Sequence, residues 1–340
     1  MTTRTLFSAV LAAGALALVP LDTPSAEPQH VLNFGTAAPE GTPWADQLNG
    51  IAQRVKTETS GAVQINIFLG STLGGELEMA RDVRRGERLQ GGGFSTSAVA
   101  TALGLPILEL PELPYLFQTN EEADAVLDDI LWGPTSDALA GKGMVLAAWA
   151  ENGWRSFATN GGAATTPAEL AAYKMRAQET DSHLCMYEQL GAQAVTKPVT
   201  EVLPSLNTGI VDGFDNTPLF SLAAGWIGPV DHYTLSRHIY QPAAVVYSKR
   251  AWDKLSPDLQ TTVLGDARAE SQAGRQGVRT LEAELLQTIR DMGKTVVELS
   301  GDQRNTFASK TASCHQDYLS RNPDMKSVYD QVQAKLASMR

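Results

Sequence analysis

The chain has 340 residues, of which 43% are apolar and 19% are charged, and this balance excludes an intrinsically disordered protein. Its length predicts two domains. The net charge of −11, without a concentrated basic stripe, argues against a nucleic-acid partner, although local positive groups in a small pocket can still bind an anion.

The first 26 residues have the pattern of a secretory signal peptide. Arg4 precedes a largely apolar run from Leu6 to Val19, and the small residues Ser25 and Ala26 come before a polar stretch. The run is too short to cross a bilayer comfortably, and no later window holds about 18 uncharged apolar residues. We therefore expect an exported protein that is soluble outside the cytoplasm.

Strand and helix patterns alternate along the first half of the chain. A strand is predicted at 31–35 and another at 63–69, separated by a helix that Thr42 caps and Pro43 begins. A second helix follows Gly74 and Gly75. The glycine run 91–93 lacks the spacing of a dinucleotide-binding motif, and we interpret it as backbone packed closely against a helix rather than against a ligand. This order indicates an α/β sheet.

The second half continues in the same manner. The apolar run 144–150 predicts a buried central strand, and a long β-rich stretch is predicted at 233–248. Short strands around Phe157, Met175 and Ala194 lie between them, with helices at about 167–172 and 181–191. From Pro257 to Met292 the pattern predicts one continuous helix, long enough to contact both domains.

The only two cysteines, Cys185 and Cys314, leave two alternatives open. An even pair in an oxidising compartment can form a disulfide, and two buried free thiols are the other possibility. Neither cysteine is expected to act as a nucleophile.

Two arginines are candidate ligand contacts. Arg176 lies in a short strand-like run, and Arg155 lies in a similar setting. Ligands of open α/β sheets bind outside the carboxyl ends of strands, and a guanidinium group fits a carboxylate with two parallel hydrogen bonds. We therefore predict capture of a small organic acid. The alternative for each arginine is an ordinary ion pair, and Asp212 and Asp215 are interpreted as solvated or capping groups.

Motifs of catalysis are missing from the sequence. It has no nucleophile elbow and no His-Glu-x-x-His metal helix, and its five histidines have no metal-site spacing. We predict a binding protein rather than an enzyme, with no catalytic residue, no cofactor and no metal.

Several segments resemble the dicarboxylate-binding DctP-type family, the extracytoplasmic solute-binding proteins of tripartite ATP-independent periplasmic (TRAP) transporters. Their order and spacing hold from about residue 31 to 260. The segments are 35–44, Leu73–Glu76, Leu113–Phe117, Asn152–Arg155, Tyr173–Arg176, Leu190–Ala192, Thr200–Val202, Asn207–Gly213 and Lys249–Leu255.

The resemblance implies a two-lobed α/β periplasmic-binding-protein (Venus flytrap) fold with a long helix spanning both lobes. Lobe one would hold 31–150 and 240–275, and lobe two 151–239 and 276–340, after a signal peptide at 1–26. The resemblance also implies a periplasmic monomer that captures an organic acid and delivers it to the small and large membrane subunits of a TRAP permease.

The resemblance assigns site residues by position. Arg176 matches the principal carboxylate-binding arginine and Arg155 a second arginine that contacts ligand. Asn216 matches an asparagine that bonds the same carboxylate. Glu76 matches a position that meets the far end of the ligand, and Trp44 is expected to wall the pocket.

Further residues suggest a partly apolar pocket. Phe214 is expected to line the ligand pocket, whereas Trp154 either lines the pocket or belongs to the apolar core. Val199 stands where the family often has an aromatic residue. The stretch from Ser95 to Thr101 offers hydroxyl groups and no charge, which weakens a sugar-acid assignment.

Three alternatives share these features. An ABC-type solute receptor would have the same two lobes and a different permease. A sensor subunit that signals to a kinase would bind ligand in the same way. A secreted hydrolase or lyase would need an acid–base or nucleophile cluster, and the sequence does not provide one.

Overall fold

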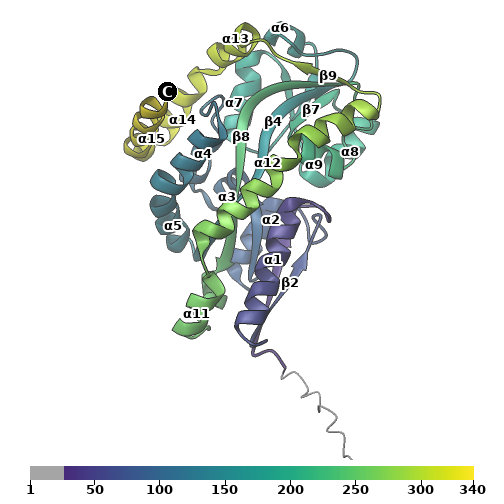
Figure 1. Ribbon diagram of the computed structural model, residues 1–340. Coiled ribbons are helices and arrows are strands. Elements are labelled where there is room, and N and C mark those ends of the chain that lie inside the picture. The colour runs from purple at the N-terminus through teal and green to yellow at the C-terminus, as the bar shows by residue number, and fades with distance from the viewer. Residues whose placement is uncertain (1–26) are drawn as a thin grey trace, which may run out of the picture.

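The computed structural model describes residues 27–340 (Figure 1), and the predicted signal peptide at 1–26 lies outside the described residues. The described strands form one sheet in the order β2-β1-β3-β8-β4-β7-β5-β6, and β9 pairs with β8. The strands are β1 (His30–Thr36), β2 (Val63–Phe68), β3 (Gly91–Ser95), β4 (Met144–Thr159), β5 (Lys174–Ala177), β6 (Gln193–Thr196), β7 (Gly213–Asn216), β8 (His232–Ser248) and β9 (Thr295–Glu298).

Helices pack around the sheet in both the upper and the lower half of the molecule in Figure 1. They are α1 (Pro43–Glu58), α2 (Glu76–Arg85), α3 (Thr96–Leu103), α4 (Asn120–Val126), α5 (Trp132–Gly141), α6 (Pro167–Leu170), α7 (Asp181–Leu190), α8 (Val199–Asn207), α9 (Pro218–Ala223), α10 (Lys249–Trp252), α11 (Pro257–Leu264), α12 (Ala267–Asp291), α13 (Gly301–Thr311), α14 (Ser313–Arg321) and α15 (Lys326–Met339). Short turns of other helix types are η1 (Pro106–Leu108), η2 (Leu110–Glu112), η3 (Leu127–Leu131) and η4 (Pro323–Met325).

Two long strands join the two halves of the molecule. β4 and β8, of 16 and 17 residues, pair antiparallel from Met144 opposite Ser248 to Thr159 opposite His232. β3 pairs with the 243–247 end of β8, whereas β7 pairs with the 156–159 end of β4. The strands therefore cross from one lobe to the other, and the separate strand expected around Phe157 is the second half of β4.

Each lobe has its own apolar core. We call lobe one the half in which β1–β3 and α1–α5 pack on one end of the crossing strands, with core residues such as Phe34, Trp44 and Trp149. Lobe two is the half with β5–β7 and α6–α9, and its core includes Phe214 and Trp226. The two-lobed α/β architecture is confirmed, while the residue boundaries of the lobes stay a prediction.

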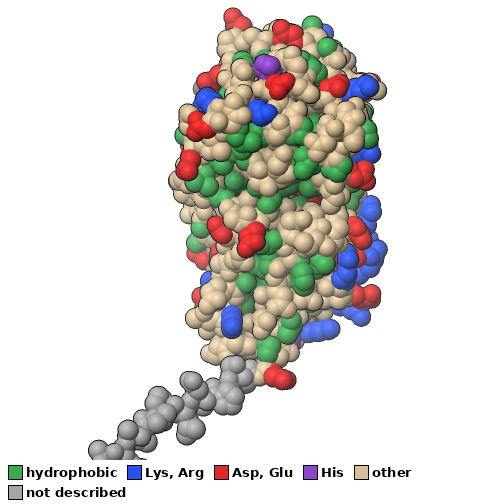
Figure 2. Space-filling view, turned by 90° about the vertical axis from the view of Figure 1, so that its right-hand side faces the viewer, with side chains coloured by type: hydrophobic (Ala, Val, Ile, Leu, Met, Phe, Trp, Pro, Cys, Tyr) green, Lys and Arg blue, Asp and Glu red, His purple; other side chains and the backbone are tan. Residues whose placement is uncertain are grey.

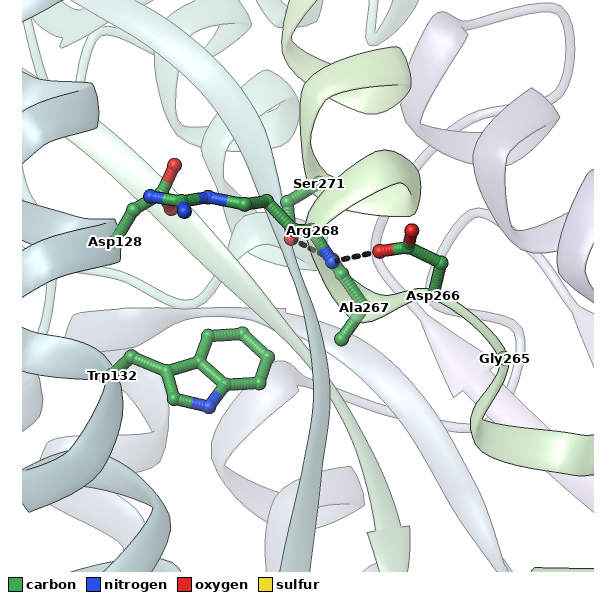
Figure 3. Close-up of a pocket in the computed structure, with 7 residues that line it drawn as sticks. All are labelled: Asp128, Trp132, Gly265, Asp266, Ala267, Arg268 and Ser271. Atoms are coloured by element: carbon green, nitrogen blue, oxygen red, sulfur yellow. Dashed lines mark hydrogen bonds between the residues drawn. The ribbon is translucent and has the colours of Figure 1, made fainter. Parts of the chain in front are cut away.

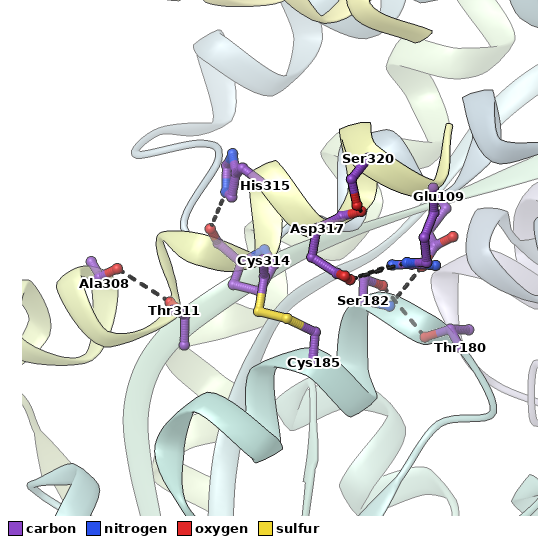
Figure 4. The surroundings of a disulfide bond; sticks show 12 residues. Glu109, Thr180, Ser182, Cys185, Ala308, Thr311, Cys314, His315, Asp317 and Ser320 are labelled. Carbon is purple, nitrogen blue, oxygen red and sulfur yellow. Dashed lines mark hydrogen bonds and ion pairs between the residues drawn. A yellow bond between two sulfur atoms is a disulfide. The ribbon is translucent and has the colours of Figure 1, made fainter. Parts of the chain in front are cut away.

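The C-terminal helices contact both lobes. Of the two alternatives for the cysteines, the structure has the disulfide, which joins Cys185 of α7 to Cys314 of α14 with a Cα–Cα distance of 5.8 Å (Figure 4). Tyr318 of α14 and Leu336 of α15 pack into the core of lobe one. The segment after β9 therefore links lobe two to lobe one beside the crossing strands.

The prediction of a single helix from Pro257 to Met292 is wrong, because the helix is interrupted between α11 and α12. Gly265 has φ +61° and ψ −148°, a conformation essentially restricted to glycine. The side chain of Asp266 then accepts hydrogen bonds from the backbone amides of Arg268 and Ala269 and starts α12. The remaining helix of 25 residues still packs against both lobes, through α1 in lobe one and α9 in lobe two.

The glycine run is confirmed as a close-packing segment, although its neighbours are mainly a strand. A Cβ atom at Gly91 would lie 2.1 Å from the ring of Phe34, and one at Gly92 would lie 2.2 Å from the carbonyl oxygen of Gly35. Only Gly93 faces a helix, through Trp44 of α1. A larger residue at Gly91 or Gly92 would push β1 away.

One face of the described part is mixed in character. On the face shown in Figure 2, acidic and basic side chains are interspersed among polar and apolar ones. Within residues 27–340, no helix is both long enough and apolar enough to span a bilayer.

Candidate functional site

Arg176 is buried near the carboxyl end of β5, between β6 and β7, as expected for a ligand-binding residue of an α/β sheet. Its Nε and Nη2 donate to one backbone carbonyl, that of Lys197, at 2.9 and 2.7 Å. The guanidinium lies over the ring of Trp226, with 5.5 Å from Cζ to the ring centroid. Only 2% of Arg176 is exposed, and no carboxylate of residues 27–340 forms an ion pair with it.

The surroundings of Arg176 disfavour an unpaired positive charge. Burial, with a smaller contribution from the neighbouring charge of Arg155, lowers the pKa of Arg176 to about 10. The group therefore remains protonated at neutral pH, but its charge is held in the protein interior without an acidic partner. Such a charge is costly, and a bound anion would relieve that cost.

Arg155 has a different environment, because its charge is already paired. Nε donates to Oδ2 of Asp215 at 2.6 Å, Nη2 donates to the Asp215 carbonyl, and Nη1 donates to Oε1 of Gln241 at 2.7 Å. Arg155 lies within the crossing strand β4, in agreement with the strand-like setting expected from the sequence. Its donors hold the crossing strands and β7 together.

Asp215 is fully buried, so its interpretation as a solvated or capping residue is wrong. Oδ1 accepts a hydrogen bond from the hydroxyl of Tyr187 at 2.7 Å, and Oδ2 lies 3.2 Å from Nε2 of His238. Burial by itself would raise the pKa of Asp215, but Arg155 and the adjacent histidine hold it well below its usual range. Burial lowers the pKa of His238 to about 4, so this imidazole is neutral at pH 7.

Asn216 lies beside this ion pair at the end of β7. Its Oδ1 accepts hydrogen bonds from Nδ2 of Asn152 at 3.1 Å and from the backbone amide of Thr217 at 2.8 Å. The acceptor side of the amide is thus used within the protein. Among residues 27–340 no acceptor bonds Nδ2 of Asn216, which leaves a donor on the side chain next to Arg155.

Glu76 is the first residue of α2 and supplies a negative group from lobe one. Its Oε1 accepts from the backbone amide of Ser95 at 2.8 Å, and its Oε2 accepts from the Ser95 hydroxyl at 2.9 Å. Although the residue as a whole is partly exposed, burial of its carboxylate raises the pKa, and the hydrogen bonds from Ser95 and the charge of Arg176 counteract this. Glu76 and Arg176 are therefore within electrostatic reach of each other from opposite lobes.

The three aromatic candidates lie in packed surroundings. Trp44 belongs to the core of lobe one, and its Nε1 is buried without a hydrogen-bond partner among the described residues. Phe214 is fully buried, and its ring meets that of Trp226 edge-on at 5.3 Å. Trp154 donates from Nε1 to Oδ1 of Asn120 at 2.7 Å. Phe214 thus supports Trp226, which in turn lies against Arg176, and Trp154 lies toward α4 and away from that arginine.

Residues that the sequence did not single out connect the two lobes at this place. Gln178, two positions after Arg176, donates from Nε2 to the hydroxyls of Ser95 at 3.2 Å and Ser97 at 2.9 Å. Trp226 and Asp215 were also missed as partners of the arginines. The position of Gln178 directly after a strand end was a usable signal, whereas Trp226 comes from a distant helix–loop segment that no local pattern connects to β5.

A small cavity borders the predicted residues and is lined by Trp154, Asn152 and Thr217, among others. A cavity of about 580 Å³ opens between α5 and the start of α12 (Figure 3), and it contains none of the predicted site residues. It is lined by Asp128, Trp132, Gly265, Asp266, Ala267, Arg268 and Ser271. No group of histidine, cysteine and acidic side chains within residues 27–340 is arranged to hold a metal ion.

Comparison with known proteins identifies the family. Residues 34–322 match the model of the family described as bacterial extracellular solute-binding protein, family 7 (DctP). The C4-dicarboxylate-binding periplasmic protein DctP of Rhodobacter capsulatus is 28% identical over 94% of this chain and 96% of its own. The 2,3-diketo-L-gulonate-binding periplasmic protein YiaO of Escherichia coli is 26% identical over 74% of this chain and 75% of its own.

Solved structures give the same result. A TRAP periplasmic solute-binding protein of Roseobacter denitrificans with bound β-D-glucuronate superposes with a TM-score of 0.84 at 25% identity, over 89% of this chain and 99% of that one. The sugar acid binding protein DctPAm of Advenella mimigardefordensis, in complex with galactonate, has a TM-score of 0.85 at 23% identity, over 91% and 99% of the two chains. The chain therefore belongs to the DctP family of TRAP-transporter solute-binding proteins.

Proposed function

We propose that this protein captures a small hydroxylated carboxylate, of the sugar-acid or hydroxy-acid class, and delivers it to the membrane subunits of a TRAP permease. The observation that carries the proposal is the buried guanidinium of Arg176, which has two hydrogen bonds to a carbonyl and no acidic partner within residues 27–340. A carboxylate would pair with this group, and the absence of competing water would strengthen the charge-assisted bonds.

The role of Arg155 in this proposal differs from that of Arg176. Because Asp215 already neutralises it, Arg155 contributes mainly by holding β4 and β7 in position next to the ligand. Asn216 supplies a donor from Nδ2 beside the carboxylate. Phe214 acts through Trp226 rather than by direct contact, and Trp44 and Trp154 remain further candidates for the wall of the site.

The far end of the ligand would meet Glu76 and Ser95. A carboxylate at this end would be repelled by Glu76, whereas a hydroxyl group can donate to it. This arrangement favours a hydroxylated monocarboxylate over a dicarboxylate. The bound glucuronate and galactonate of the structural relatives point in the same direction, so we revise the view that the uncharged stretch from Ser95 to Thr101 weakens a sugar-acid assignment.

The same comparisons support a role in transport rather than in catalysis. The family consists of extracellular solute-binding proteins, and the solved relatives are TRAP components rather than ABC receptors. We propose a periplasmic protein that acts as a monomer, without cofactor or metal, and returns its ligand chemically unchanged. A kinase-linked sensor would bind ligand in the same way but would not support uptake by cells that carry the permease.

Calorimetric titration with a panel of acids tests the proposal. The panel holds D-glucuronate, D-galactonate, L-gulonate, malate and succinate. We expect tight binding of at least one hydroxylated monocarboxylate and weak binding of succinate. A ligand at roughly 100 times its Kd should also stabilise the fold by about 2.7 kcal/mol. Failure of every acid to bind, or recovery of a chemically altered ligand by NMR, would contradict the proposed function.

A further inference from the structure

The side-chain amide of Gln178 connects lobe two, lobe one and the crossing strand β8. Gln178 follows β5 in lobe two, and only 7% of it is exposed. Its Nε2 donates to the hydroxyls of Ser95 and Ser97 in lobe one, at 3.2 and 2.9 Å. Its Oε1 accepts from Nε2 of Gln241 at 2.9 Å, and Gln241 lies in the crossing strand β8.

The orientation of this amide is fixed by a chain of donors and acceptors. Arg155 can only donate, so the side-chain atom of Gln241 that it contacts must be oxygen. The Nε2 of Gln241 then donates to Oε2 of Glu112 and to Oε1 of Gln178. Gln178 must therefore direct its NH₂ group at the two serine hydroxyls, and the amide has no alternative rotamer of equal energy in this arrangement.

We propose that Gln178 is an interlobe latch, a positioning residue that holds the lobes closed over the ligand and slows ligand release. This inference rests on the proposed function and extends it to a residue that need not touch the ligand. The three bonds of Gln178 can form together only when lobe two, lobe one and β8 are in their closed arrangement. Separation of the lobes breaks both serine contacts at once.

The latch also connects the two ends of the ligand site. Gln178 lies two residues beyond Arg176 on the same segment, so a shift of one moves the other. The Ser95 hydroxyl that accepts from Gln178 donates to Glu76. A carboxylate on Arg176 and a hydroxyl on Glu76 would therefore stabilise the two sides of the latch, and the closed latch would in turn hold both ligand contacts in place.

Two variants separate the hydrogen bonds from the space that the side chain fills. Gln178→Ala removes the amide and leaves a gap, whereas Gln178→Leu keeps a similar volume without a donor or acceptor. Gln189→Ala is the matched control, because Gln189 is exposed on α7. Each change is made in the full mature chain, and its thermal unfolding without ligand is recorded to confirm folding.

Two measurements read the latch. Spin labels on Lys56→Cys in α1 and Ala171→Cys beside α6, both exposed positions of opposite lobes, report the interlobe distance with and without D-glucuronate. Stopped-flow fluorescence reports the association and release rates of D-glucuronate. We expect both Gln178 variants to shift the distance distribution toward longer values and to speed release about tenfold, a factor that corresponds to about 1.4 kcal/mol, with the association rate little changed.

These measurements can refute the role of Gln178 as a latch independently of the proposed function. If the Gln178 variants match Gln189→Ala in distance and release rate, or if the unmodified protein never populates the short distance, the latch is refuted. If D-glucuronate and the other acids do not bind, the proposed function fails, yet the ligand-free distances still test the latch. If a Gln178 variant only lowers the unfolding temperature and leaves the interlobe distances unchanged, Gln178 has a structural role and is not a latch.

Discussion

At the scale of single residues, Arg176 and Arg155 differ in what surrounds them rather than in their chemistry. Both guanidinium groups are buried, but one bonds the carboxylate of Asp215 and the other bonds only a backbone carbonyl among the described residues. A buried charge without a partner is costly, and under the proposed function a bound carboxylate would relieve that cost at Arg176. The distinction between the two arginines therefore depends on Asp215.

Asp215→Asn tests the structural role of this pair. The change leaves Arg155 buried without a counter-charge, and we expect it to lower the free energy of unfolding at pH 7 by about 3–5 kcal/mol. Urea denaturation measures the loss, with the exposed Asp231→Asn as control. A loss below about 1 kcal/mol, similar to that of the control, would contradict the assignment.

The same pair predicts a dependence on pH. Because the pKa of Asp215 is depressed in the folded protein, its contribution is fully present above the unfolded value of about 4 and is lost as the pH falls through the folded value. The difference in stability between the unmodified protein and Asp215→Asn should therefore shrink below about pH 4.

Glu76→Gln tests whether the ionised carboxylate of Glu76 destabilises the folded protein. The pKa of Glu76 is raised in the folded protein, so its ionised form destabilises the fold above that pKa and has no such effect below about pH 4. We expect the variant to be more stable than the unmodified protein at pH 8 and to lose this advantage on acidification. Thermal unfolding at both pH values measures the effect, and a variant that is less stable at pH 8 would contradict it.

The site residues named from the sequence stay a prediction. Glu76 and Asn216 were assigned through the family resemblance, and in the fold Glu76 lies within electrostatic reach of Arg176, whereas Asn216 lies beside Arg155. The roles of Arg155 and Asp215 depend on a pairing between β4 and β7 that brings together residues 60 positions apart. No local pattern encodes such a contact, whereas Gln178 lies directly after a strand end and could have been selected on that ground.

At the scale of elements, periodicity and capping residues located most helices and strands. Thr42 caps α1 as expected, with its hydroxyl accepting from the amide of Ala45 at 3.3 Å. The error over residues 257–292 has a simple physical origin. A helical pattern on both sides of Gly265 does not reveal the φ of the glycine between them, and only the backbone geometry shows that it interrupts the helix.

Removal of the disulfide tests the link between α7 and α14. The bond closes a long loop, with its cysteines 129 positions apart, and restricts the unfolded chain accordingly. The double change Cys185→Ser and Cys314→Ser should lower the free energy of unfolding by about 2–5 kcal/mol. Urea denaturation under oxidising conditions measures the loss, and the unmodified protein in reducing buffer is the parallel test. Equal stability of both forms would show that the bond contributes nothing to folding.

At the scale of the whole molecule, the two-lobed arrangement came from a family resemblance and not from periodicity. Local patterns predicted β8 as one long stretch but divided β4 into two strands, because bulges interrupt the pairing along β4. The lobes meet around Arg176, Glu76 and Gln178, so a ligand bound there would contact both. Closure is then driven by the contacts that the ligand makes in the closed state only.

The most direct test of the account is calorimetric titration of Arg176→Ala with the best-binding acid, beside Arg81→Ala, an exposed control on α2. Loss of one partner of a buried charge pair costs on the order of 2–5 kcal/mol. We therefore expect roughly 30- to several-thousand-fold weaker binding for Arg176→Ala. We also expect poor binding for Arg176→Lys and normal binding for the control. A loss below about fivefold for Arg176→Ala would contradict the claim that this guanidinium holds the ligand's carboxylate.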